Sequence, residues 1–425
     1  MVGDFGKAAL GDRLMKRFDI ILGVCEGKEI TLLGCSEETR NFYLTSEAQS
    51  SQSSYRVEQI LVGQHFKERK GIKFGRMVVE YSHLNEWAGV SGIKVEAPAN
   101  VDDEWIIRYK RPPRIEWTKV GDYNFSIDFG VSFPSFAAVQ SEAKFEQSSG
   151  VVIRNTTKQH LDEYWKFARS IQDLLSLGVD VPVHIVSLKG RIDDDSPSQN
   201  LVRVYFGQAG FPKSIGYVHP GLMTFRLADM PVPSSGSNDY LKNWLEKNER
   251  LQPILALYST TVYGVPTYLE NEFLNMVQAL ESYHRRFASN YELRTEEHQK
   301  RIEEIVGAVK EDYRDWLRNQ LQFSNELSLR KRLRDIVDRY ASAIERTIGN
   351  KEEFVETVIS ARNYQTHYDE KLKSRAASGQ NLFRITQVLK LLLEMCLVEE
   401  LGFDRGQVNV MFGRKASRIA TIPLS

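Results

Sequence analysis

The residues best suited to chemistry lie near the C-terminal end of the chain, in the segment from Ala361 to Glu370. The segment holds Arg362, the polar Asn363 directly after it, and His367 five positions after the arginine. Arginine is a permanent, fork-shaped ligand for phosphate, and histidine transfers protons near neutral pH. The two together are what cleavage of a phosphodiester needs, because one group holds charge while the other moves protons.

The spacing of these residues limits how they can act. On a regular helix Asn363 and His367 are four apart and share a face. Arg362 and His367 are five apart and point roughly 140° from each other. Two arrangements would bring them to one phosphate: a helix that begins inside the motif, or a second protomer that completes the site.

The run Arg362-Asn363-x-x-x-His367 resembles the Arg-x4–6-His signature of the HEPN ribonucleases, including the polar residue after the arginine. The segment FLNMVQALESYHRRF resembles the first helix of ApeA-type HEPN domains, and the segment from His83 to Gly89 resembles a recurrent feature of ApeA N-terminal regions. The chain is therefore similar to the ApeA group of bacterial anti-phage proteins, which join a β-rich N-terminal region to a HEPN domain.

This resemblance implies a dimeric endoribonuclease with two motifs facing each other, in which His367 activates a ribose 2′-hydroxyl and Arg362 binds the phosphate. Asn363 would orient His367 or donate to a phosphate oxygen. We expect no metal and no other cofactor. The resemblance further implies abortive infection by a toxic RNA cut, with transfer RNA as one candidate target and a phage-derived trigger.

Other polar residues in the chain are weaker candidates for a catalytic or metal-binding site. Arg154 and His160 also fit Arg-x4–6-His, but a strand is expected to end at Arg154 and a helix to open near Thr157, so Asn155 and its threonines make a better helix cap than a catalytic group. The run Asp193–Asp195 indicates a solvated turn. The remaining histidines lack metal-ligand spacing.

The composition is that of a globular protein: 42% of the 425 residues are hydrophobic, and the mean hydropathy is −0.38. Lys+Arg and Asp+Glu balance at 56 each, so no global positive field attracts a polyanion and RNA must meet a local basic surface. Three cysteines without C-x-x-C spacing favour a reducing cytoplasm. No signal peptide and no membrane-spanning segment are expected.

The N-terminal half is predicted to be mostly strands. The clearest is Tyr123–Phe133, which alternates large apolar and small or polar residues at period two. Trp87 is assigned to the core, and Glu47–Ser54 is expected to be a loop. Further strands are predicted at 30–33, 74–81, 104–109, 151–153, 181–188, 201–206 and 222–227, and helices at 157–177 and 240–251.

Past Pro266 only helical periodicity remains. Helices are predicted from 267 to 287, 295 to 321, 329 to 343 and 383 to 398. His284 lies in the apolar stripe of the first and is expected to be packed. The last is apolar on nearly every side, which predicts either the centre of the bundle or a dimer interface.

The densest positive cluster lies on the polar face predicted for 329–343. We consider Arg330, Lys331 and Arg334 as RNA-backbone contacts, with a merely solvated face as the alternative. Arg332 and Arg339 belong to the same predicted polar face.

The expected fold is therefore α+β and multidomain, with a β-rich region at 1–262, which could split near 150, followed by an all-α HEPN bundle at 263–425. The alternative to a nuclease is a catalytically inert, dimerising interaction or sensor protein whose β-rich half binds a partner.

Overall fold

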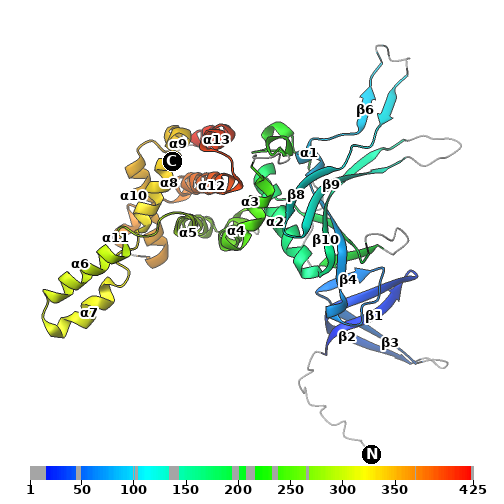
Figure 1. Cartoon of the computed structure of the whole chain (residues 1–425), viewed down its shortest axis with the longest axis horizontal. Coiled ribbons are helices and arrows are strands. Elements are labelled where there is room, and N and C mark those ends of the chain that lie inside the picture. Colours follow the sequence, from blue (N-terminus) through cyan, green and yellow to red (C-terminus); the bar gives the residue numbers. More distant parts are fainter. Residues whose placement is uncertain are drawn as a thin grey trace, which may run out of the picture. The chain divides into compact units, whose positions relative to one another are not determined.

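A computed structural model describes most of the chain (Figure 1): residues 16–44, 49–98, 100, 104–133, 143–193, 201–206, 216–231, 238–264, 268–368 and 370–422. The fold is α+β, with a β-rich N-terminal region followed by a helical C-terminal region, as predicted. The chain forms two compact units. The sheet unit comprises Met1–Asn85, Val90–Arg169 and His184–Tyr217, and the helical unit comprises Glu86–Gly89, Ser170–Val183 and Val218–Ser425.

The sheet unit is built on one antiparallel sheet, whose order over the described residues is β1-β2-β4-β12-β11-β5-β10-β9-β8, with β3 paired to β2. Its strands are β1 Arg17–Cys25, β2 Lys28–Leu44, β3 Gln49–Arg56, β4 Gln59–Val62, β5 Lys73–Tyr81, β8 Ile115–Val120, β9 Tyr123–Ser132, β10 Glu146–His160, β11 Ile185–Arg191 and β12 Val202–Phe206. A separate hairpin pairs β6 Ile93–Glu96 with β7 Ile106–Tyr109.

Alternating side chains explain where the core of the sheet unit lies. On β9, Phe125, Ile127 and Phe129 are buried, as the period-two pattern predicts. The helix α2 (Leu161–Val179) packs here through its first turns, where Tyr164 donates to the Phe74 carbonyl at 2.8 Å. Helix α2 continues into the helical unit from Ser170 onward.

Trp87 is fully buried, which confirms its assignment to the core. It stands on a short helix, α1 Leu84–Ala88. The Gly178 backbone lies so close to the indole that a Cβ there would meet Trp87 Nε1 at 2.7 Å. Only a glycine therefore fits beside this ring.

Several predictions for the N-terminal half are wrong. Residues from Gln49 to Ser54 belong to β3, because pairing with β2 holds this polar segment extended. The helix predicted from Thr157 begins at Leu161, since β10 continues past a bulge and pairs with β5 as far as His160. The strand predicted at 222–227 is absent from these described residues. Two short 3-10 helices, η2 Pro220–Leu222 and η3 Leu227–Asp229, bracket that segment instead.

The helical unit contains the C-terminal helices shown in Figure 1. They are α3 Tyr240–Glu246, α4 Asn248–Val262, α5 Leu269–Phe287, α6 Thr295–Gly307, α7 Glu311–Leu321, α8 Leu329–Arg339, α9 Ala341–Ile348, α10 Lys351–His367, α11 Glu370–Lys373, α12 Gly379–Leu401 and α13 Arg405–Ala420. Helix α12 is buried on every side over most of its length, so it forms the centre of the bundle within one chain.

A buried ionic cluster interrupts this apolar centre. Glu394 of α12 is 1% exposed and accepts hydrogen bonds from Lys415 Nζ at 2.6 Å and Tyr258 Oη at 2.8 Å. Burial alone would raise the pKa of the Glu394 carboxyl, but Lys415 and Lys390 outweigh that effect and lower this pKa. The carboxylate is thus buried in its charged form, with cations and a phenol as its partners.

Two predicted long helices are each divided. The helix predicted over 295–321 is broken between α6 and α7, and the helix predicted over 329–343 is broken at Tyr340, between α8 and α9. The two halves are buried differently: Val306 of α6 is 3% exposed, whereas Tyr313 and Trp316 of α7 are 57% and 61% exposed. The predicted aspartate turn and the proposed boundary at Pro266 lie largely or wholly outside the described residues.

Candidate functional site

All three residues of the C-terminal motif lie on one helix, α10. Asn350 caps its start by accepting a hydrogen bond from the Glu353 amide at 2.9 Å, and His367 is its last helical residue. Phe354, Val358 and other apolar residues of its buried face hold it in the bundle. Because the helix begins well before Arg362, the arrangement in which a helix starts inside the motif is wrong.

Two residues of the motif are hydrogen-bonded to each other, and the third is exposed. Arg362 and Asn363 are half-buried, and Arg362 Nη1 donates to Asn363 Oδ1 at 3.1 Å. His367 is exposed. In the described part of the chain no hydrogen bond joins Asn363 to His367, so the amide positions the guanidinium rather than the imidazole. The imidazole remains accessible to a substrate.

Helical geometry keeps the two charged groups of one chain apart. A separation of five residues corresponds to roughly 140° around the axis, and the intact helix from Lys351 to His367 leaves no hinge between them. A single chain therefore carries Arg362 and His367 on different sides of the axis of α10.

The helix ends in an unusual turn that the sequence did not predict. Tyr368 follows His367 in the left-handed conformation, with φ 50° and ψ 36°, and its amide donates to the Tyr364 carbonyl at 2.6 Å. The two phenol rings meet edge to face, 5.8 Å between centroids. Left-handed helix ends normally carry glycine or asparagine, so nothing in the sequence marked Tyr368. Tyr368, the residue directly after His367 in the sequence, is 68% exposed, so the turn presents an aromatic side chain at the end of α10.

The basic cluster on α8 is largely compensated by carboxylates. Arg330 is paired with Glu356 of α10, which lowers the pKa of the Glu356 carboxyl, and Lys331 is paired with Glu292 at 2.5 Å. Arg334 is exposed. Its RNA contact, like those of Arg330 and Lys331, stays a prediction.

Arg332 departs from the expected polar face. It is fully buried, and its Nε donates to the Leu327 carbonyl at 2.9 Å. Beside it lies His284, which is 3% exposed. The His284 Nε2 atom lies 3.1 Å from the Asp335 Oδ2 atom. Burial lowers the pKa of the His284 imidazole. The carboxylate of Asp335 acts in the opposite direction and raises this pKa, but burial is the larger effect. The prediction that His284 is packed is confirmed.

The other Arg-Asn…His run has a different setting. Arg154, Asn155 and His160 all lie on strand β10, where Asn155 Oδ1 accepts from the Thr157 amide at 2.9 Å next to the bulge. The asparagine thus shapes a strand irregularity and caps no helix, which corrects the expected role.

Two features are absent from the described residues. No group of three or more His, Cys, Asp or Glu side chains in that part of the chain could hold a metal ion. Among the same residues, no helix combines the length and the apolar character that crossing a membrane requires.

Two known protein families match most of the chain between them. The ApeA N-terminal domain 1 family matches residues 5–244, more than half of the sequence, and the Apea-like HEPN family matches residues 274–407. The chain belongs to the ApeA family. The HEPN match includes α10 with Arg362, Asn363 and His367. No curated protein and no solved structure matches the chain.

HEPN domains are generally ribonuclease-like, and they commonly dimerise and act on RNA. The family therefore supplies a class of chemistry for the helical unit of this ApeA-family chain. The segment that matches this family includes the C-terminal end of α10, where Arg362, Asn363 and His367 lie.

Proposed function

We propose that this ApeA-family chain is a cytoplasmic endoribonuclease of bacterial anti-phage defence, with its active site at the end of α10. The observation that carries the proposal is the exposed His367 at the end of a helix that also holds the Arg362–Asn363 pair, inside the segment that matches the Apea-like HEPN family. An imidazole open to solvent and a guanidinium held by an amide fit a proton-transfer group and a phosphate ligand.

The proposed reaction needs no redox step and no cofactor. His367 removes the proton from a ribose 2′-hydroxyl, and that oxygen attacks the adjacent phosphorus. The bond from phosphorus to the 5′-oxygen breaks, and the leaving oxygen takes a proton from a second donor. The products are a 2′,3′-cyclic phosphate and a 5′-hydroxyl. Arg362 stabilises the charge that builds on the phosphate.

A homodimer supplies what one chain lacks. Because Arg362 and His367 of one helix diverge, the proposed site pairs two α10 ends across a two-fold axis. The partner's His367 is then the second proton donor. Asn363 restrains Arg362, so that the guanidinium meets the phosphate with fewer rotamers to lose.

The proposed biological outcome is abortive infection, in which a cut in an essential RNA halts the infected cell. Transfer RNA is one candidate target, and a phage-derived molecule is the proposed trigger. Arg334 is an exposed candidate on α8 for contact with the RNA backbone.

The test is cleavage of a defined RNA by the purified full-length protein, with chelator present. We expect fragments that carry a 2′,3′-cyclic phosphate and a 5′-hydroxyl, and no cleavage of the matching DNA, which lacks the attacking hydroxyl. A 3′-hydroxyl with a 5′-phosphate, cleavage of DNA at a similar rate, or loss of activity in chelator would each refute the mechanism.

A second candidate function rests on exposed aromatic side chains of α7 and of the turn that follows it. Tyr313, Trp316 and Phe323 are each more than half exposed, a pattern typical of surfaces that meet another protein. If the chain is an inert interaction protein, substitutions at His367 leave phage protection intact while substitutions at Trp316 abolish it.

A further inference from the structure

Two adjacent strands of the sheet unit separate part-way along their length. β11 and β12 pair only over Leu188–Gly190 and Val202–Val204. Beyond that ladder, β12 continues along β4 and β11 continues along β5. The segments Ile185–Ser187 and Tyr205–Phe206 therefore border a gap in the sheet. Their peptide groups on the gap side are not paired with each other.

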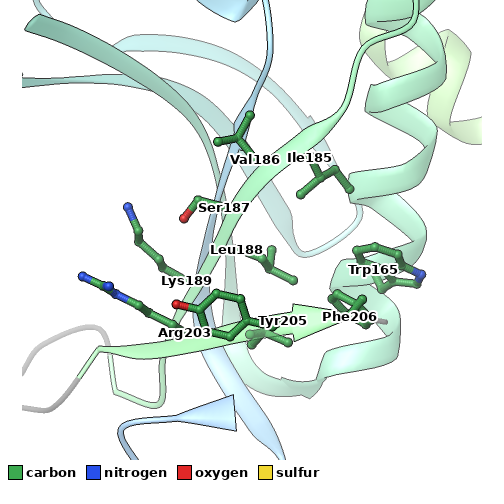
Figure 2. A pocket seen from close by; sticks show the side chains of 10 residues that line it. Trp165, Ile185, Val186, Ser187, Leu188, Lys189, Arg203, Tyr205 and Phe206 are labelled. Atoms are coloured by element: carbon green, nitrogen blue, oxygen red, sulfur yellow. The ribbon is translucent and has the colours of Figure 1, made fainter. Parts of the chain in front are cut away.

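This gap is a cavity of about 260 Å³ (Figure 2). Its floor is apolar: the Trp165 indole of α2 stacks on Phe206 with ring centroids 3.7 Å apart and planes at 24°, and Leu188 and Val204 are buried beside them. The floor suits a flat, weakly polar group.

The rim of the cavity is positive and aromatic. Lys189 and Arg203 face each other in register across the ladder and extend side by side in Figure 2, with the Tyr205 phenol next to Arg203. Lys189 is paired with Glu80 at 2.6 Å. In the described part of the chain Arg203 has neither an ion pair nor a side-chain hydrogen bond, and it is exposed. One guanidinium is thus available to an anion.

We propose that this cavity, here called the strand-gap pocket, binds a nucleoside monophosphate. A base is flat enough to enter between two strands, and its edge carries the donors and acceptors that separated strand edges can pair with. The phosphate, with a charge of about −1.5 to −2 near pH 7, lies against Arg203, whose fork suits two phosphate oxygens.

The size and charge of the pocket favour a single nucleotide over larger ligands. At about 260 Å³ the cavity is below the range of drug-sized sites, roughly 300–1,000 Å³. An extended peptide could also pair with strand edges, but it would not need the guanidinium. The pocket lies wholly within the sheet unit and shares no residue with the α10 motif, so the inference does not depend on the proposed nuclease.

The test is calorimetric titration of the full-length protein with AMP, GMP, CMP and UMP, and separately with the nucleosides and inorganic phosphate. We expect at least one monophosphate to bind with a Kd of about 10⁻⁶–10⁻³ M. Arg203→Ala should weaken that binding about tenfold to a hundredfold, because a hydrogen-bonded charge pair is lost. The matched control Arg108→Ala removes an exposed arginine of the same unit from β7 and should bind as wild type.

Ser187→Phe provides an independent check, because it places a ring in the gap and leaves Arg203 unchanged. Binding should then be lost while the melting temperature stays near that of the wild type. The proposal is overturned if no monophosphate binds, if inorganic phosphate binds as tightly as every nucleotide, or if a short extended peptide binds and the nucleotides do not. Unchanged binding in either pocket variant would also overturn it.

Discussion

The chain contains two runs that begin with Arg-Asn and end with histidine, and they lie in different kinds of structure. In β10 the Asn155 oxygen accepts from the Thr157 amide and hydroxyl, so it fixes the local backbone at a bulge. In α10 the Asn363 oxygen accepts from the Arg362 guanidinium, so it fixes a side chain. The same residue types therefore do different work according to the element that carries them.

The endings of the two runs differ in the same way. His160 still pairs with Lys73 in the sheet, directly before α2 begins. His367 is the last residue of its helix and is exposed. The two runs have similar spacing, but the imidazole of His367 is exposed and that of His160 is only partly exposed.

The difference between the two runs is tested most directly by removing each imidazole in turn. His367→Ala should lower the rate of RNA cleavage by about 10²–10⁴, the usual contribution of a positioned acid–base group. His160→Ala should leave the rate within twofold of the wild type. The measurement is single-turnover cleavage of a labelled RNA. Cleavage by His367→Ala at the wild-type rate would contradict the proposed acid–base role.

The arginines should differ almost as much. Arg362→Ala is expected to reduce cleavage by about 10²–10³, since one preorganised charge at the phosphate is lost. Arg362→Lys should recover only part, because an ammonium lacks the planar fork. Arg154→Ala should leave the cleavage rate unchanged. Full activity of Arg362→Lys would indicate that only charge matters at this position.

The asparagines give the smallest and most informative contrast. Asn363→Ala should reduce cleavage about tenfold, equivalent to about 1.4 kcal/mol, with little change in stability. Asn155→Ala should cost about 1 kcal/mol in the free energy of unfolding and leave cleavage unchanged. Urea titration measures the free energy of unfolding, and single-turnover kinetics measures the cleavage rate. If Asn363→Ala changes stability alone, its contact with Arg362 is structural.

Much of the fold could be predicted from periodicity. The alternation of β9, the apolar stripe of α5 and the all-round apolar character of α12 each specify how the element is buried, and the structure agrees. The polar strand β3 could not be predicted, because its extended form comes from pairing with β2 rather than from its own Ser and Gln residues.

The candidate site could be predicted only in part. Local pattern marked Arg362, Asn363 and His367 as one group, but the Arg362–Asn363 bond depends on rotamers that spacing does not specify. The ion pairs of Arg330 and Lys331 could not be foreseen either. Their acidic partners, Glu356 and Glu292, are 26 and 39 positions away in the chain.

The backbone turn at Tyr368 has a cost that bears on how this protein could be altered. A side chain with a Cβ in the left-handed region is strained by about 1–2 kcal/mol relative to glycine. Tyr368→Gly would relax that strain and make the protein harder to melt. The strained turn thus presents a phenol that is 68% exposed and meets Tyr364 edge to face, and replacing it with glycine would remove that aromatic contact along with the strain.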